Sequence, residues 1–238
     1  MKFLYNAPAM LHKGAVIVGD THFGMERKLR QRGIHDEQFS LKLFHKLKGL
    51  IERHKARKVI FLGDVKEDIT MLDDKTQDVL SRLSLLCEII IVRGNHDGGI
   101  ADCGCAKIVP SEGFVYGGLG LTHGHSWPEK SLMECEYLVM GHQHPMLTVI
   151  DRSGKRHAEP VWVVAPPDKK RISMHYKKFN ERIKLVLMPA FNPLVGSSIN
   201  TRTEERLGPV LNNKLFKLNS ALILRLDGTR LGKLSNIS

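Results

Sequence analysis

The stretch Arg93-Gly94-Asn95-His96-Asp97 directly follows an apolar run at residues 88–92. Four consecutive residues that favour β-structure, ended by a glycine and three polar residues, are typical of a buried strand that opens into a loop at its carboxyl end. In open α/β sheets, ligands bind at this edge. The three polar side chains offer metal-ligand and proton-transfer groups, but the same residues are common in polar turns. The stretch alone therefore leaves both interpretations open.

Two earlier stretches repeat this pattern. The run 15–18 ends at Gly19-Asp20-Thr21-His22, and the run 58–62 ends at Gly63-Asp64. The intervening sequence predicts one amphipathic helix that begins at Asp36, its N-cap, and a second one around residues 79–86. The charged stretch 24–33 is expected to be a loop. Strands that alternate with helices in this way predict an α/β fold with a parallel sheet.

Short strands replace the helical pattern after residue 99. They are predicted at residues 114–116, 119–122, 137–140, 185–188 and 221–226, with a hairpin of 147–150 and 161–164 around the turn-like residues 151–154. Two of these strands end at histidine pairs, His123-Gly124-His125 and Gly141-His142-Gln143-His144.

Five predicted strands thus end in potential metal ligands. These are Asp20 with His22, Asp64, Asn95 with His96, His123 with His125, and His142 with His144. A single histidine beside a strand is usually structural, but five such endings at one sheet edge indicate a dinuclear metal centre. Asp64 is suited to bridge two ions about 4 Å apart. Asp-x-His and His-x-His, if extended, place both side chains on one side. Imidazole, carboxylate and amide ligands favour manganese, iron or zinc over magnesium or calcium.

In combination and order, these motifs resemble those of the calcineurin-like metallophosphoesterases. Residues 63–66, 98–99 and 144–145 are similar to the predicted ICC-like phosphoesterases, many of them archaeal, and to a DNA-ligase-associated branch. The resemblance implies a four-layer α-β-β-α sandwich of two mixed β-sheets. It also implies that residues 1–238 form a single domain, in which the basic segment 166–184 matches the family less well.

The resemblance implies two ligand sets that share Asp64. One set is Asp20, His22, Asp64 and His144; the other is Asp64, Asn95, His123 and His142. His123 and His125 are both available in the fourth motif. The residue before the glycine is the family's usual ligand, so His123 is preferred, while His125 and Asn95 are expected to contact substrate.

The resemblance also gives the expected catalytic groups and cofactors. His96 is expected to offer a proton or hydrogen bond to the phosphate or the leaving oxygen. Asp97 either fixes the tautomer of His96, the preferred interpretation, or caps the loop. Two divalent ions, expected to be manganese with iron, zinc or nickel as alternatives, would activate water for in-line attack on phosphorus.

The net charge of +11 is concentrated in the last third of the chain. Residues 1–150 hold 19 Lys and Arg against 18 Asp and Glu, a net of +1, whereas residues 151–238 hold 17 against 7, a net of +10. Such a surface attracts polyanions such as nucleic acid, although it can also be simply a solvated cationic face. The four cysteines are irregularly spaced, and no apolar run approaches the roughly 20 residues of a membrane span. A cytoplasmic protein without a membrane partner is therefore expected.

The sequence favours a metal-dependent phosphoesterase that hydrolyses phosphodiesters by a two-metal mechanism, in nucleic acid or nucleotides. One alternative is a phosphatase that acts on a small phosphorylated metabolite. Another is a nucleic-acid-binding subunit without catalysis.

Overall fold

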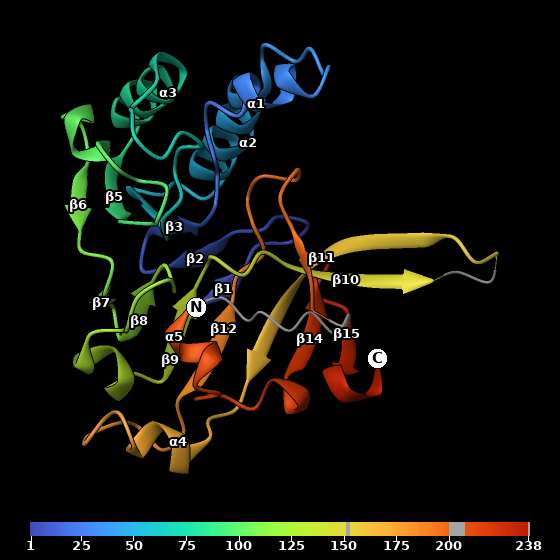
Figure 1. Cartoon of the computed structure of the whole chain (residues 1–238). Helices are drawn as coiled ribbons and strands as arrows, with labels where there is room; N and C mark the ends of the chain where they lie inside the picture. Colours follow the sequence, from blue (N-terminus) through green and yellow to red (C-terminus); the bar gives the residue numbers. More distant parts are fainter. Residues whose placement is uncertain (151–152, 200–207, 238) are drawn as a thin grey trace.

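The computed structural model describes residues 1–150, 153–199 and 208–237, and its strands form two mixed sheets (Figure 1). The first sheet has the order β1-β2-β3-β4-β5-β6. Its strands are β1 (Lys2–Phe3), β2 (Met10–His12), β3 (Ala15–Val18), β4 (Lys58–Phe61), β5 (Glu88–Val92) and β6 (Lys107–Val109). Because β3 to β6 are mutually parallel, their carboxyl ends share one edge.

The second sheet has the order β13-β10-β11-β12-β9-β8-β7, with β14 paired to β11 and β15 paired to β14. Its strands are β7 (Phe114–Tyr116), β8 (Leu119–Thr122), β9 (Tyr137–Met140), β10 (Pro145–Ile150), β11 (Arg156–Ala165), β12 (Lys184–Leu187), β13 (Ser197–Ser198), β14 (Leu222–Arg225) and β15 (Arg230–Lys233). The central strands β8, β9 and β12 are parallel to one another. Two mixed sheets confirm the predicted α/β fold.

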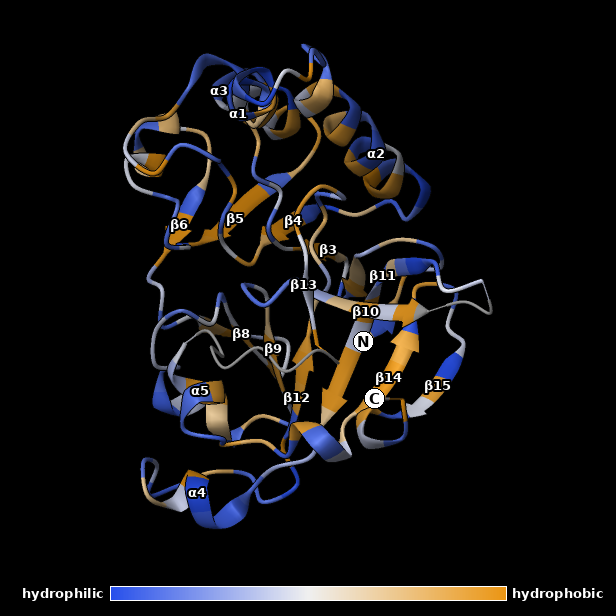
Figure 2. Ribbon diagram, turned by 45° about the vertical axis from the view of Figure 1, so that its right-hand side comes forward, coloured by the Kyte–Doolittle hydropathy of each residue, from blue (hydrophilic) through white to orange (hydrophobic). Residues whose placement is uncertain are grey.

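Helices cover the outer face of each sheet, which gives the four layers visible in Figure 2. The first sheet carries α1 (Glu26–Gln31), α2 (Phe39–Arg53) and α3 (Asp74–Ser84); the second carries the short helices α4 (Lys169–Ser173) and α5 (Pro209–Asn212). Alternate residues of β3 belong to different hydrophobic cores. Val16 and Val18 pack under α2 and α3, while Ile17 packs between the sheets against Val139 and Trp162. Since both faces are buried, these strands are apolar without alternation.

Three local predictions differ from the structure. The stretch 24–33 contains α1, because Leu29 is buried in the core and the Glu26 carboxylate accepts hydrogen bonds from the backbone N–H and the hydroxyl of Ser40. Helix α2 begins after Gln38 rather than Asp36. A hairpin of β10 with β11 forms, but the predicted pairing is wrong: β10 pairs with residues 156–160, whereas residues 161–164 pair with β14. Residues 151–152 of its turn lie outside the described residues. In the described ranges, no helix has the length and apolar character needed to cross a membrane.

Candidate metal centre

The carboxyl ends of strands from both sheets meet at one point. Backbone hydrogen bonds join the loop after β3 to the loop after β4: Asp20 N–H donates to Gly63 O at 3.1 Å and His22 N–H to Asp64 O at 3.0 Å. The loop after β9 joins them from the other sheet, because His142 N–H donates to the Asp20 carboxylate at 3.1 Å. Polar residues far apart in the sequence therefore form one cluster.

Five of the predicted ligand residues have left-handed backbones. The φ angles are 56° at Asp20, 45° at His22, 49° at Asp64, 65° at His142 and 44° at His144, and the described chain has only four other non-glycine residues with positive φ. This conformation costs free energy for residues with a Cβ and concentrates at functional sites. The expected extended geometry is therefore wrong for Asp20-x-His22 and for His142-x-His144, in which both ligand residues have left-handed backbones.

One ligand group combines Asp20, His22 and His144. Their potential ligand atoms all lie within 4.8 Å of one another. His144 Nε2 is 3.0 Å from Asp20 Oδ1, yet no hydrogen bond of acceptable geometry reaches this buried nitrogen or Nε2 of His22 within the described residues. Buried ring nitrogens without hydrogen bonds are suited to a metal ion.

A second group combines Asp64, His123 and His142, again with ligand atoms within 4.8 Å of one another. His123 Nδ1 is 2.6 Å from Leu62 O. Because a carbonyl only accepts, Nδ1 carries the proton, which leaves the Nε2 lone pair facing inward, as in metal-binding histidines. Asn95 Oδ1 lies 3.1 Å from His123 Nε2, so this amide oxygen points to the same place.

Asp64 lies between the two groups. Its Oδ2 is 3.9 Å from His22 Nε2, and its Oδ1 is 3.4 Å from His123 Nε2. The side chain is almost fully buried. One oxygen facing each group is the arrangement that a bridging carboxylate requires.

The electrostatics of the cluster favour a bound cation. Burial by itself lowers the pKa of His123, but the hydrogen bond with Asp64 and the charge of Asp20 outweigh it and raise this pKa to about 9. Burial likewise raises the pKa of Asp64, but its contacts with His123 outweigh it and hold the pKa of the carboxyl far below its usual value. Carboxylates that stabilise a proton on a buried imidazole would stabilise a metal ion in its place. The residues present thus fit divalent metal ions.

Two glycines permit the close approach of these loops. A Cβ on Gly94 would lie 2.2 Å from the backbone nitrogen and Oδ1 of Asp64, and a Cβ on Gly63 would lie 2.4 Å from His123 Nδ1. Both contacts are shorter than any tolerated packing distance, so only glycine fits at these strand ends.

A family model described as "Calcineurin-like phosphoesterase superfamily domain" matches residues 14–178. The chain belongs to this superfamily. A search of curated proteins found no match. The structure is similar to that of the nuclease MPE of Pseudomonas putida, with a TM-score of 0.58, 20% identity, and 92% of this chain and 88% of that one covered. It is also similar to Yfce, a phosphoesterase from E. coli, with a TM-score of 0.45, 15% identity, and 92% and 97% covered.

The contacts of Asp97 differ from the interpretation preferred from the sequence, in which Asp97 fixes the tautomer of His96. Its buried carboxylate accepts hydrogen bonds from Gly94 N–H at 2.7 Å and Val65 N–H at 2.9 Å, and burial raises its pKa. The ring of His96 instead places Nδ1 2.9 Å from Glu67 O. The structure thus corrects the expected role of Asp97: it caps two loops, because their backbone N–H groups need an acceptor, and the Glu67 carbonyl orients His96.

His125 borders the second ligand group but is set back from it. Its ring centroid lies 5.1 Å from that of His123 and 6.0 Å from that of His142. Burial lowers its pKa, and the charge of His123 acts in the same direction. Between the two histidines of this motif, His123 is the one that faces Asp64. Arg93, which was not expected to take part in the site, is exposed.

Two residues at the site were not predicted. Glu67 Oε2 lies 2.9 Å from His22 Nδ1, and Lys28 pairs with the other carboxylate oxygen. The available signal was an acid three residues after Asp64 in the same loop. Buried Asn192 donates to Thr21 O at 3.1 Å and so supports the loop between Asp20 and His22. It lies far along the chain, and no local pattern marks it.

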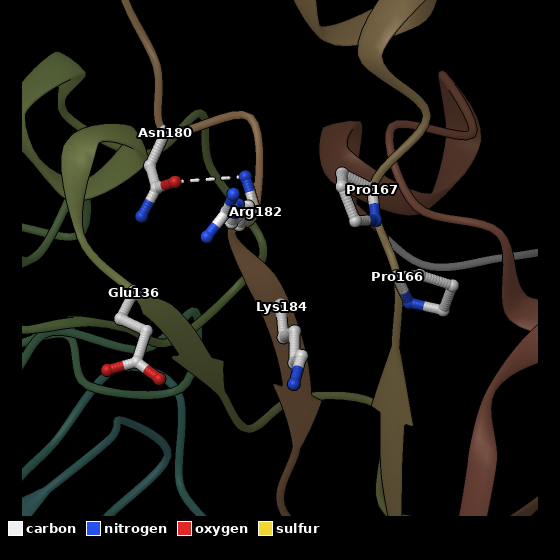
Figure 3. A pocket seen from close by; sticks show the side chains of 6 residues that line it. All are labelled: Glu136, Pro166, Pro167, Asn180, Arg182 and Lys184. Carbon is white, nitrogen blue, oxygen red and sulfur yellow. Dashed lines mark hydrogen bonds between the residues drawn. The ribbon is translucent and has the colours of Figure 1, made fainter.

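The basic segment starts at the opposite end of the second sheet. Ala165, the residue just before the segment, pairs with Leu185 near the start of β12. Because β12 runs parallel to β9, whose carboxyl end lies at the site, the start of β12 lies at the opposite end of the sheet. At this far end, a pocket of about 580 Å³ lies between β9, β12 and the end of β11 (Figure 3). It is lined by Glu136, Pro166, Pro167, Asn180, Arg182 and Lys184. Much of the positive charge is therefore not in contact with the metal-ligand groups.

Proposed function

We propose that this protein is a dinuclear metal-dependent phosphoesterase that hydrolyses phosphodiester bonds in nucleic acid. The observation that carries the proposal is the position of Asp64, with one oxygen toward His22 and the other toward His123. The fold itself does not require that two histidine-containing groups share one buried carboxylate, whereas a pair of bridged metal ions does.

In this proposal Asp20, His22, Asp64 and His144 hold one ion, and Asp64, Asn95, His123 and His142 hold the other. Bound in this way, two divalent ions, which we propose to be manganese, supply an activated nucleophile and neutralise charge on the phosphate. The protein's part is to fix the ligands: Leu62 O holds the ring of His123, and Glu67 holds that of His22.

His96 is the residue we propose to act on the substrate. Its backbone N–H donates to Asp64 Oδ1 at 2.9 Å, which ties the loop to the ligand cluster. Since the Glu67 carbonyl can only accept, Nδ1 carries a proton and Nε2 is left for the substrate. In the imidazolium form, Nε2 can donate a proton to the leaving oxygen.

Two observations support nucleic acid as the substrate class. The excess of basic residues after residue 150 provides long-range attraction for a polyanion. The name of the similar P. putida structure, a nuclease, agrees with a diester substrate.

The test compares Mn²⁺-dependent hydrolysis of bis-p-nitrophenyl phosphate with that of p-nitrophenyl phosphate, using His96→Ala as the control variant. Faster turnover of the diester, lost in the variant, is the expected result. Preference for the monoester would replace the proposal with a phosphatase acting on a small metabolite. Absence of both activities in protein that contains its metal would contradict catalysis of this kind.

A further inference from the structure

The loop that follows His123 leads from the metal-ligand groups to an exposed tryptophan. Trp127 is 39% exposed and lies only two residues after His125. Two residues of extended chain span at most about 7 Å, so the indole lies close to the proposed reaction centre. The protein's other tryptophan, Trp162, is fully buried between the sheets.

The basic segment packs against this loop. The rings of Trp127 and His175 have centroids 4.6 Å apart at an interplanar angle of 35°. Next to them the Tyr176 hydroxyl donates to Pro128 O at 2.9 Å, which anchors the segment to the loop. The segment therefore begins at the far end of the sheet but reaches back toward the site at Trp127.

Three lysines of this segment make no ion pair with any described residue. Lys170, Lys177 and Lys178 are exposed, and the described part of the chain provides no ion pair for any of them. By contrast, Lys169 pairs with Glu181 at 2.7 Å. Positive charge without an internal acid beside an exposed aromatic pair is the composition of surfaces that bind single-stranded nucleic acid.

Two polar atoms between the ligand groups and Trp127 also lack partners. His125 Nδ1 and Ser126 Oγ are buried and make no hydrogen bond with the described residues. Buried polar atoms are normally satisfied, so these two call for a ligand. A phosphate oxygen would accept a hydrogen bond from the serine hydroxyl and, where Nδ1 carries the proton, from His125.

We propose that His125, Ser126, Trp127 and His175, flanked by Lys170, Lys177 and Lys178, bind the segment of single-stranded nucleic acid next to the bond that is cleaved. This inference rests on the proposed function. His125 and Ser126 take the phosphate adjoining the metal centre, a base stacks on Trp127, and the lysines follow the backbone. A duplex would not stack in this way, because its bases are paired with their faces covered.

Binding can be measured independently of hydrolysis. In the His96→Ala background with Mn²⁺, a deoxythymidine 12-mer is titrated while tryptophan fluorescence and its quenching by iodide are recorded. Because Trp162 is buried, iodide reports on Trp127. We expect the oligonucleotide to quench the emission and protect it from iodide. The affinity of variants at Trp127 is measured instead by the fluorescence anisotropy of a fluorescein-labelled 12-mer, and we expect Trp127→Ala to weaken binding about tenfold, as for the loss of one stacked base.

Trp127→Phe, which retains a stacking ring, is expected to recover most of the affinity, and Tyr5→Ala, which removes another exposed aromatic, to retain all of it. Unchanged affinity in Trp127→Ala, or binding that leaves Trp127 open to iodide, would overturn the inference. Duplex bound as tightly as the single strand would also overturn it, as would no binding at all. Failure of the proposed function is seen separately, as wild-type protein that binds the 12-mer through Trp127 but hydrolyses no phosphoester.

Discussion

The two ends of the second sheet use polar residues in opposite ways. At the carboxyl ends of β8 and β9, His123 and the backbone of His142 are built into a buried network with Asp20 and Asp64. At the other end and along α4, lysines and arginines are exposed, and several make no ion pair with the described residues. The first region holds a few side chains at fixed distances, and the second spreads charge over a surface.

This difference predicts how each region responds to substitution. A buried ligand cannot be replaced by a neighbour, so single changes at the site should have large effects. Exposed cations act over distances of about 8 Å at physiological salt and partly substitute for one another. Single changes in the basic segment should therefore have small effects that depend on salt.

The largest effect is expected for Asp64→Asn. The amide keeps the size of the carboxylate but cannot give a negatively charged oxygen to both groups, so both metal sites weaken. We expect kcat/KM for bis-p-nitrophenyl phosphate to fall by at least about 10³-fold, which corresponds to about 4 kcal/mol, and bound metal measured by atomic emission to fall with it. Asp68→Asn, four residues along the same loop, should retain both. Full metal content in Asp64→Asn would contradict a bridge.

His96→Ala should lower kcat by about 10²- to 10³-fold, as for the loss of a general acid. Metal content should not change, because alanine keeps the backbone N–H that donates to Asp64. Single-turnover kinetics and atomic emission on the same preparation separate the two effects. Loss of metal together with activity would make His96 a part of the metal site instead.

The sequence predicted the buried region well because each position there follows a strand. Glycine and ligand residues after an apolar run place side chains at one sheet edge whatever the details of packing. The sequence could not predict the left-handed backbones of Asp20 or His144, or the orientation of Asp97. These features depend on which backbone N–H groups of other loops lack an acceptor. Asn192 contacts Thr21 from a distant part of the sequence, so only the folded chain reveals it.

Composition alone could not place the basic region in the fold. Seventeen Lys and Arg after residue 150 implied attraction for polyanions but not where that attraction acts. The register of β11 with β12 puts the start of the segment far from the ligand groups, and the contacts of His175 with Trp127 and of Tyr176 with Pro128 bring it back. A ring contact between residues 48 positions apart cannot be read from periodicity.

Glu67→Gln tests whether a residue that contacts a ligand contributes less to metal binding and activity than the ligands themselves. The amide can still contact His22 Nδ1, but the negative charge that makes this ring a stronger ligand is lost. A drop of about 10- to 100-fold in activity or metal affinity is expected. The apo protein is titrated with Mn²⁺, and the activity at each concentration gives the metal affinity. Glu52→Gln, on the exposed face of α2, is the control. Wild-type affinity would show that the charge of Glu67 does not act on the metal site.

The smallest effect is expected for Lys177→Ala combined with Lys178→Ala. Loss of two phosphate contacts should reduce affinity for the deoxythymidine 12-mer several-fold at low salt and lower the slope of log K against log salt by about 1.4. The double variant Arg53→Ala with Arg57→Ala removes the same charge at the opposite edge of the first sheet and should leave the slope unchanged. Equal slopes in both double variants would mean that the basic segment does not contact the strand.

The central claim, two ions that share Asp64, is tested most directly by anomalous diffraction from crystals soaked in Mn²⁺. We predict two anomalous peaks about 4 Å apart, one on each side of the Asp64 carboxylate, with His22 and His144 at one and His123 and His142 at the other. A single peak, or peaks that do not contact Asp64, would contradict the claim.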